Sequence, residues 1–102
     1  MIPILETRSA EIAEICRRFH VKRLDVFGSA ARESDFTDQS DIDLLVEYED
    51  SHEGPRFADY LDLRGALTDV LGRKVDLVMA GAVQNPYILA GIERSRQPVH
   101  GT

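Results

Sequence analysis

Two aspartates stand at the head of an unbroken apolar run in Ser40-Asp41-Ile42-Asp43-Leu44-Leu45-Val46. Side chains alternate between the two faces of a β-strand, so Asp41 and Asp43 should project to the same side. The apolar run predicts a central strand, because continuous apolar sequences are typical of strands inside a sheet. Aspartate is disfavoured in strands, so this acidic pair beside buried leucines needs a partner that compensates its charge.

A third carboxylate, Asp76, lies in a second strand-like run, Lys74-Val75-Asp76-Leu77-Val78. If this run pairs beside the first, Asp76 joins Asp41 and Asp43 on one face of the sheet. Three crowded carboxylates repel one another, so a divalent cation is their most natural partner. The plainer interpretation is that Asp41 caps the strand while Asp43 faces solvent.

Two other kinds of acidic site fit this sequence less well. A calcium loop needs a glycine at its sixth position and a glutamate at its twelfth, and neither follows from Asp35 or Asp41. A sugar-transfer site of the Asp-x-Asp type normally belongs to a much larger nucleotide-sugar domain. The length of this chain counts against that alternative.

A tight turn after Val26-Phe27 offers a place for phosphate. Gly28 allows the backbone to turn sharply and to approach a ligand closely. Ser29 then begins a short helical turn, and its hydroxyl and the N–H groups nearby are available to an anion. The plainer interpretation is a simple strand-to-helix turn, in which glycine and serine are common. Metal and phosphate together suggest nucleotide chemistry.

The hydrophobic periodicity along the whole chain predicts a small sheet with helices around it. The predicted elements are a helix over 4–19, strands over 21–27, 42–48 and 74–79, loops over 34–40 and 49–55, a helix over 56–71, a short helix from Asn85-Pro86 to about Arg94, and an extended piece over 98–100. Their order predicts an α/β (α+β) fold, with a small mixed β-sheet flanked by helices.

Length and composition exclude several classes of protein. At 102 residues the chain is long enough for one core and too short for two, so we expect a single domain over 1–102. The net charge of −6 argues against direct nucleic-acid binding, which usually needs a basic face. The lone Cys16 excludes an internal disulfide and a cysteine-based zinc site, and its apolar neighbours predict a buried, inert thiol.

The chain also lacks the sequence features of membrane and secreted proteins. No apolar run approaches the ~20 residues that span a bilayer. The N-terminus has no basic start followed by an apolar segment, as a signal peptide would. We therefore expect a cytoplasmic protein with no membrane contact.

One combined motif resembles the minimal nucleotidyltransferases of the DNA polymerase β superfamily: Phe27-Gly28-Ser29-Ala30-Ala31-Arg32, then Ser40-Asp41-Ile42-Asp43-Leu44-Leu45-Val46, then Asp76. In prokaryotes these small proteins are commonly the antitoxin half of MNT/HEPN toxin–antitoxin pairs. The leading helix, the Val-Asp-Leu-Val strand and the closing helix also follow the family's order. This chain departs from the family in its gap from Ala30 to Ser40, which is one residue longer than usual, and in having Glu33-Ser34 after Arg32. The extra residue predicts an enlarged loop over 34–40.

The resemblance implies a polymerase β-like nucleotidyltransferase fold and a defined reaction. A Mg²⁺-dependent protein adenylyltransferase would transfer AMP from ATP to a tyrosine hydroxyl of a partner HEPN ribonuclease toxin, and would neutralise the toxin. Its catalytic and metal-binding residues, for two Mg²⁺ ions, would be Asp41, Asp43 and Asp76. The nucleotide's phosphates would be bound by Gly28, Ser29 and Arg32. For Arg32, contact with a partner's carboxylate and a solvated helix position remain alternatives.

Two other functions stay open at this point. An antitoxin with a vestigial site would neutralise a HEPN toxin by binding alone, and the departures at 33–40 favour that alternative. A nucleotide-transfer domain acting on a small molecule, such as an antibiotic, is the weaker alternative, because those enzymes usually carry an added helical domain. A chain this short offers no obvious pocket for the base, so we expect a partner to complete base selection or the acceptor site.

Overall fold

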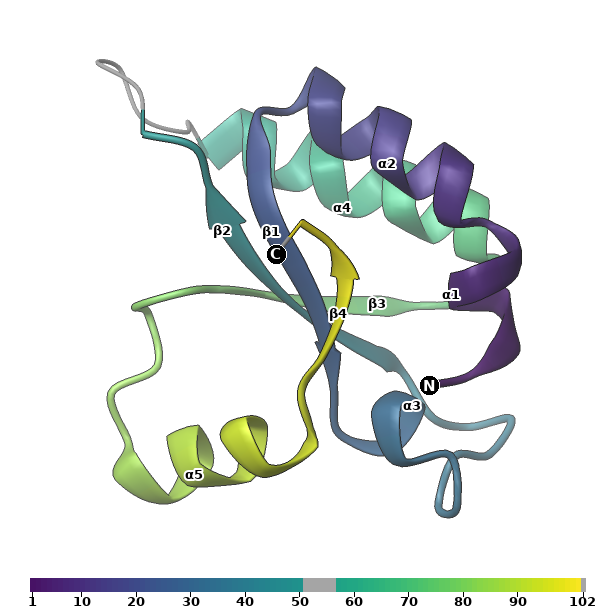
Figure 1. Ribbon diagram of the computed structural model, residues 1–102, viewed down its shortest axis with the longest axis vertical. Helices are drawn as coiled ribbons and strands as arrows, with labels where there is room; N and C mark the ends of the chain where they lie inside the picture. The colour runs from purple at the N-terminus through teal and green to yellow at the C-terminus, as the bar shows by residue number, and fades with distance from the viewer. Residues whose placement is uncertain (51–56, 102) are drawn as a thin grey trace.

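The computed structural model describes residues 1–50 and 57–101, which form a mixed four-stranded sheet with helices around it (Figure 1). The strands are β1 (Val21–Phe27), β2 (Ile42–Tyr48), β3 (Val75–Met79) and β4 (Gln97–His100). Their order across the sheet is β3-β2-β1-β4, with β2 parallel to β3 and antiparallel to β1. The predicted fold class is therefore confirmed, and β2 is one of the two inner strands, as its apolar run predicted.

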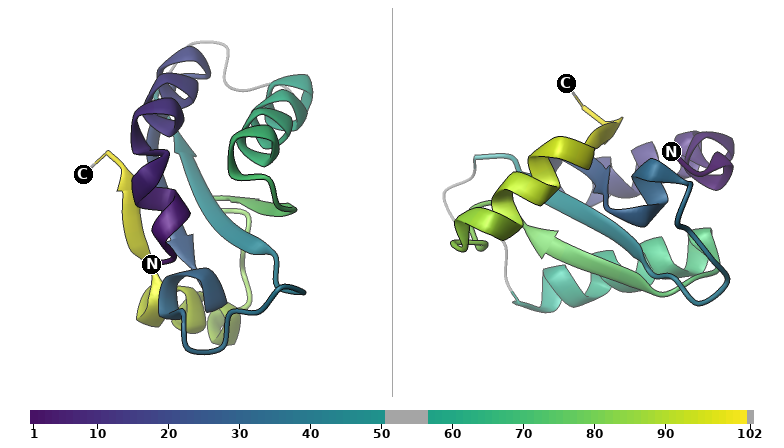
Figure 2. Two further views of the ribbon diagram at one scale, coloured as in Figure 1. Left: turned by 90° about the vertical axis from the view of Figure 1, so that its right-hand side faces the viewer. Right: turned by 90° about the horizontal axis from the view of Figure 1, so that it is seen from below.

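Helices cover both faces of this sheet. They are α1 (Pro3–Thr7), α2 (Ser9–Arg18), α3 (Ser29–Arg32), α4 (Phe57–Leu71) and α5 (Pro86–Ser95). Helices α2 and α4 pack on one face, and Figure 2 shows α5 on the side of the sheet away from α4. The short α3 follows β1 directly at the lower end of the sheet in Figure 1.

Alternation along the strands divides the sheet into an apolar face and a polar face. The apolar face packs against α2 and α4, and its fully buried strand residues include Leu24, Val26, Leu44 and Val46. The residues between them, Asp25, Asp43 and Leu45, project to the opposite face. Leu45 on β2 and Ile92 on α5 are both buried, and neither belongs to the main core. Their burial places α5 on this second face.

The predicted helix over 4–19 is wrong in one respect, because the chain forms two helices there. The break is at Arg8, whose φ of −100° and ψ of 17° leave the α region. The Thr7 hydroxyl donates to the Pro3 carbonyl oxygen at 3.0 Å, a back-bond that tends to bend helices. The Ile2 N–H donates to the Ala30 carbonyl oxygen at 2.9 Å, which ties the chain entering α1 to α3.

The C-terminal quarter follows its prediction closely. Asn85 caps α5, since its side-chain oxygen accepts hydrogen bonds from the N–H groups of Tyr87 at 2.9 Å and Ile88 at 3.4 Å. The extended piece over 98–100 is β4, an edge strand that pairs antiparallel with β1. Pro98 suits an edge position, because it has no N–H to donate to a further strand.

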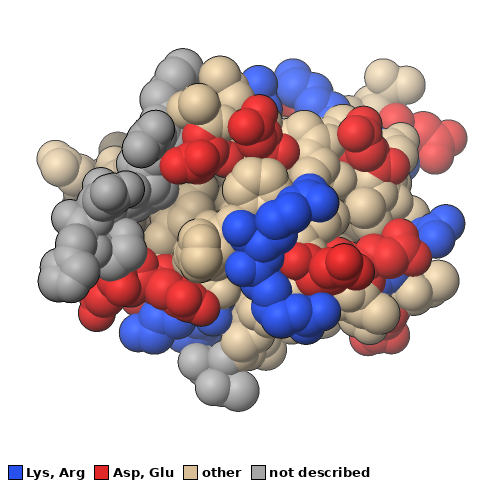
Figure 3. All heavy atoms as spheres, turned by 90° about the horizontal axis from the view of Figure 1, so that it is seen from above, with Lys and Arg blue, Asp and Glu red and all other residues tan. Residues whose placement is uncertain are grey.

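The predicted loop over 49–55 falls largely outside the described residues, as does residue 56 of the predicted helix. The surface at the end of the molecule away from α3 and α5 carries acidic and basic side chains interspersed (Figure 3). Among the described helices, none has both the length and the apolar character that crossing a bilayer requires.

Candidate active site

The turn between β1 and α3 brings the backbone of Gly28 against a carboxylate. Gly28 has a φ of 68° and a ψ of −148°, a conformation that glycine adopts readily and other residues avoid. A Cβ atom added at this position would lie 2.6 Å from Oδ2 of Asp43, so the Asp43 side chain would have to shift. Glycine is therefore favoured here by the backbone conformation, and its lack of a side chain leaves room for the Asp43 carboxylate where it stands.

The hydrogen bonds of this turn leave donors available at its start. The Gly28 carbonyl oxygen accepts from the N–H groups of Ala31 at 3.1 Å and Arg32 at 3.0 Å. The N–H groups of Ser29 and Ala30 have no hydrogen-bond partner within the ranges that the structure describes. Backbone N–H groups of this kind, together with the Ser29 hydroxyl, can bind the oxygens of a phosphate group.

The three predicted carboxylates come from two neighbouring strands. Asp43 on β2 is the direct register partner of Asp76 on β3, so the two side chains share a face of the sheet. Asp41 precedes β2 by one residue and lies two residues before Asp43. Burial, together with the negative charges of Asp76 and Asp41, raises the pKa of Asp43 from 3.8 to about 6. The charge repulsion predicted from the sequence therefore contributes to this rise, after burial.

A divalent cation suits the chemistry of this group, although the side chains do not yet converge. Mg²⁺ prefers carboxylate oxygens, and the raised pKa of Asp43 marks a place where negative charge lacks compensation. Over residues 1–50 and 57–101, no three acidic, histidine or cysteine side chains lie close enough together to hold a metal ion as they stand. Oδ2 of Asp41 lies 3.8 Å from Nζ of Lys74, and Asp76 is exposed. Asp41 and Asp76 must therefore turn toward Asp43 before all three can share a cation.

Arg32 lies beside the site and is engaged with its own loop. Its guanidinium donates to both oxygens of Asp35, at 3.0 Å from Nε and 2.6 Å from Nη2. The hydrogen bond to Asp35 and the negative charges of Asp35 and Asp43 raise the pKa of Arg32. Arg32 and Asp35 are both exposed. Contact with a phosphate would require Arg32 to leave Asp35.

The loop that leads into Asp41 is held by Arg73, a residue that the sequence did not single out. Nη2 of Arg73 donates to the carbonyl oxygens of Thr37 at 2.8 Å and Ser40 at 2.6 Å. Its guanidinium also lies 4.5 Å from the centre of the Phe36 ring. Arg73 follows the end of α4, and no local pattern connects it to a loop more than thirty positions earlier.

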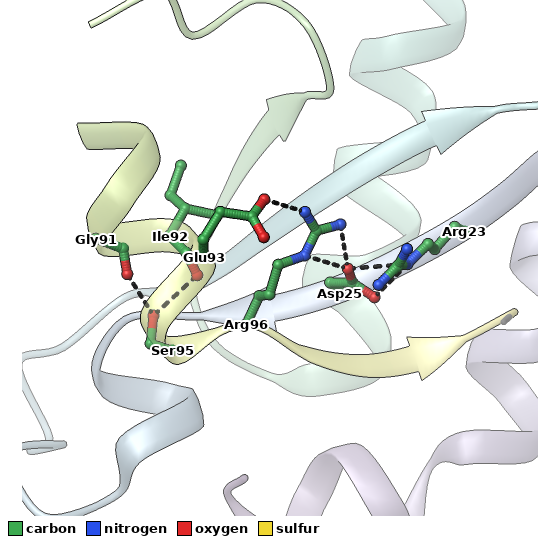
Figure 4. Close-up of polar contacts among 7 residues, drawn as sticks. All are labelled: Arg23, Asp25, Gly91, Ile92, Glu93, Ser95 and Arg96. Carbon is green, nitrogen blue, oxygen red and sulfur yellow. Dashed lines mark hydrogen bonds and ion pairs between the residues drawn. The ribbon is translucent and has the colours of Figure 1, made fainter. Parts of the chain in front are cut away.

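A second cluster ties the phosphate turn to α5, and Figure 4 shows its side chains from β1 and from the end of α5. The Ser95 hydroxyl oxygen accepts the N–H of Gly28 at 3.0 Å. The next residue, Arg96, donates to Oδ2 of Asp25 from Nε at 2.8 Å and from Nη2 at 2.6 Å. Asp25 is fully buried on β1 and also accepts from Nε of Arg23 at 3.1 Å. An aspartate within the apolar run of β1 was the one sequence signal for this cluster.

Comparison with known proteins places the chain in a family. The family model described as "Nucleotidyltransferase domain" matches residues 9–99. "Putative protein adenylyltransferase MJ0128" of Methanocaldococcus jannaschii is 42% identical over 92 residues, which cover 82% of this chain and 90% of that protein. "Protein adenylyltransferase MntA" of Thermococcus cleftensis is 35% identical over 77 residues, which cover 76% of this chain and 74% of that protein.

Solved structures share the fold. "Structure of putative minimal nucleotidyltransferase" has a TM-score of 0.74 and 35% identity, and the match covers 92% of this chain and 94% of that one. The MNT antitoxin in the complex with "tri-AMPylated Shewanella oneidensis HEPN toxin" matches with a TM-score of 0.67 at 19% identity, over 96% of this chain and 73% of that one. The second likeness concerns the fold alone. Because the family model and these alignments span most of the chain, the protein belongs to the nucleotidyltransferase domain family, as one of its minimal members.

Proposed function

We propose that this protein is a Mg²⁺-dependent protein adenylyltransferase that transfers AMP from ATP to a tyrosine hydroxyl of a HEPN-family toxin. The observation that carries the proposal is the direct approach of the Gly28 backbone to Asp43, which itself pairs in register with Asp76. This approach brings the turn that we propose for phosphate next to Asp43, one of the carboxylates that we propose for the metal. Relatives named as protein adenylyltransferases support the reaction, and the complex of an MNT antitoxin with an AMPylated HEPN toxin supports the partner.

The reaction needs an acceptor oxygen placed opposite the pyrophosphate leaving group. In the proposed reaction the tyrosine oxygen attacks the α-phosphorus, the bond from that phosphorus to the bridging oxygen breaks, and pyrophosphate leaves. Asp76, the most exposed of the three carboxylates, is the proposed recipient of the hydroxyl proton. Mg²⁺, when bound by Asp41, Asp43 and Asp76, supplies charge neutralisation for the triphosphate and lowers the pKa of the attacking hydroxyl.

The phosphate turn has a separate role in the proposal. The N–H groups of Ser29 and Ala30 and the Ser29 hydroxyl hold the triphosphate oxygens, so the α-phosphorus is presented to the carboxylates. Arg32 adds a positive charge near the same oxygens once it exchanges Asp35 for phosphate. The backbone donors of Ser29 and Ala30 are already available, whereas Arg32 must first leave Asp35.

A second candidate is neutralisation by binding alone. The observation that favours it is the open arrangement of the carboxylates, in which Asp41 pairs with Lys74 and Arg32 pairs with Asp35. In that case the toxin is covered and never modified. The two candidates differ in whether the partner gains mass.

Intact-mass spectrometry of a HEPN-family partner, after incubation with this protein, ATP and Mg²⁺, distinguishes them. The parental protein should add one or more AMP units, and Asp41→Asn or Asp43→Asn should add none while keeping the parental circular dichroism spectrum. Asp69→Asn, an exposed carboxylate on α4, is the matched control and should add AMP at the parental rate. Unmodified partner whose ribonuclease is nonetheless inhibited by all four proteins would support binding alone and reject the transferase.

A further inference from the structure

The hydroxyl of Ser95 has a defined role in the hydrogen-bond network around Gly28. A serine hydroxyl has one proton to donate and two lone pairs that accept. Ser95 donates its proton to the Gly91 carbonyl oxygen at 3.1 Å, within its own helix, with Ile92 O at 3.5 Å as a longer alternative. Its oxygen is then free to accept the Gly28 N–H at 3.0 Å, a contact that joins residues 67 positions apart.

The end of α5 cannot slide away from Gly28 without breaking a buried ion pair. Arg96 binds Asp25 through two N–H groups, and Asp25 lies on β1 three residues before Gly28 (Figure 4). Nε of Arg23 lies 3.0 Å from Oδ2 of the same carboxylate. Charge-assisted bonds to a carboxylate with no exposed surface are costly to break, so they fix the C-terminal end of α5 on β1.

This anchoring fixes the position of Gly28, which lies between Ser95 on α5 and Asp43 on β2. Gly28 has Ser95 on its amide side, and Oδ2 of Asp43 lies 2.6 Å from the position that a Cβ would take. A rotation of the Gly28 peptide would shift the following N–H groups, those of Ser29 and Ala30, relative to Asp43. Because the Gly28 N–H is already used by Ser95, these two following N–H groups are the ones left for phosphate.

We propose that Ser95 is a positioning residue for the nucleotide: its hydroxyl holds the Gly28 peptide so that the Ser29 and Ala30 N–H groups face the triphosphate. The proposal rests on the proposed nucleotidyl transfer, and adds a residue of α5 that touches neither metal nor phosphate. Thr68 on α4 offers a comparison, because its hydroxyl makes the same back-bond to the carbonyl four residues earlier, Arg64 O, at 2.8 Å. Thr68 lies on the helix that packs against the opposite face of the sheet.

The test measures binding of Mg²⁺·ATP by calorimetry, which needs no partner protein. Ser95→Ala should weaken ATP binding about five- to tenfold, since one hydrogen bond is lost and a part-buried N–H is left unpaired. Ser95→Thr, which keeps the hydroxyl, and Thr68→Ala should each stay within about twofold of the parental affinity. Hydrogen exchange at the Gly28 amide should accelerate in Ser95→Ala and remain slow in Ser95→Thr. If Ser95→Ala does not fold, Ser95→Cys replaces it, because a thiol accepts hydrogen bonds poorly.

The outcomes separate this proposal from the one it rests on. Parental affinity in a folded Ser95→Ala or Ser95→Cys, or an equal loss in Thr68→Ala, would overturn the role of Ser95 and leave the transferase intact. A parental protein that binds ATP and never modifies its partner would reject the transferase, while the comparison of Ser95 variants still decides the positioning role. A parental protein with no affinity for ATP would overturn both.

Discussion

Replacing Arg96 with alanine tests how strongly the buried carboxylate of Asp25 depends on its partners. Arg96 supplies two of the hydrogen bonds to Asp25, at 2.8 and 2.6 Å, and Arg23 supplies another at 3.1 Å. Removing one partner of a buried ion pair typically costs about 3–5 kcal/mol, because the remaining charge stays out of water. Arg23 continues to bind Asp25, so we expect the lower end, about 3 kcal/mol.

A loss of this size is large for a chain of 102 residues. Domains of about this length lose roughly 4–8 °C in melting temperature per kcal/mol, so Arg96→Ala should melt at least about 12 °C below the parental protein. Urea unfolding followed by circular dichroism measures the free energy directly. Arg94→Ala, which removes an exposed cation from the same helix, is the matched control and should change it by less than about 1 kcal/mol.

A double variant separates the ion pair from the packing of the arginine stem. Asp25→Asn with Arg96→Ala should lose less than the sum of the two single variants, because the second change removes the charge that the first left unpaired. Strictly additive losses, or a loss in Arg96→Ala no greater than in Arg94→Ala, would refute the reasoning. Either result would mean that Asp25 finds water or another partner at little cost.

Three further predictions concern other parts of the molecule. Asp43→Asn, in EDTA, should raise the free energy of unfolding by about 1–2 kcal/mol at pH 8, because the pKa of Asp43 is raised from 3.8 to about 6 and solvent screening reduces the full effect. The gain should vanish below about pH 4, where the carboxyl is protonated in both the folded and the unfolded state. A gain in stability that is the same at every pH would contradict this reasoning. Burial raises the pKa of Cys16 to about 12, so iodoacetamide at neutral pH should label it only when the protein unfolds, and rapid labelling of the native protein would disprove burial. Arg73→Ala should accelerate amide exchange over residues 37–40, because the carbonyls of Thr37 and Ser40 lose their donor; unchanged protection there would show that the loop is held by other contacts.

Local patterns were sufficient for most of the secondary structure. The strand over 42–48 could be predicted because apolar continuity, flanking polar residues and length all agreed. The cap at Asn85 could be predicted because capping is a contact between near neighbours. The break at Arg8 could not, since the apolar spacing of Leu5 and Ile12 continues across it without interruption.

In the candidate site, the sequence could predict only the positions that follow from alternation along neighbouring strands. The facing positions of Asp43 and Asp76 followed from alternation along each strand plus one assumption, that the two strands pair. The contacts of Arg73, Ser95 and Arg96 depend on tertiary approach between segments far apart in the sequence. Side-chain contacts between segments so far apart leave no periodic pattern in the sequence, so sequence patterns alone did not reveal them.

The pairing of β4 with β1 has a consequence for the order in which a newly synthesised chain folds. Leu24 pairs with His100, and the Gly28 N–H donates to the hydroxyl of Ser95, which is translated 67 residues later. During synthesis, the apolar face of β1 and β2 can pack on α2 before residues 95–100 have left the ribosome. In the role proposed for Ser95, the Gly28 N–H acquires its hydrogen-bond partner only after residues 95–100 have emerged, so the proposed phosphate site is completed after the apolar core has begun to pack.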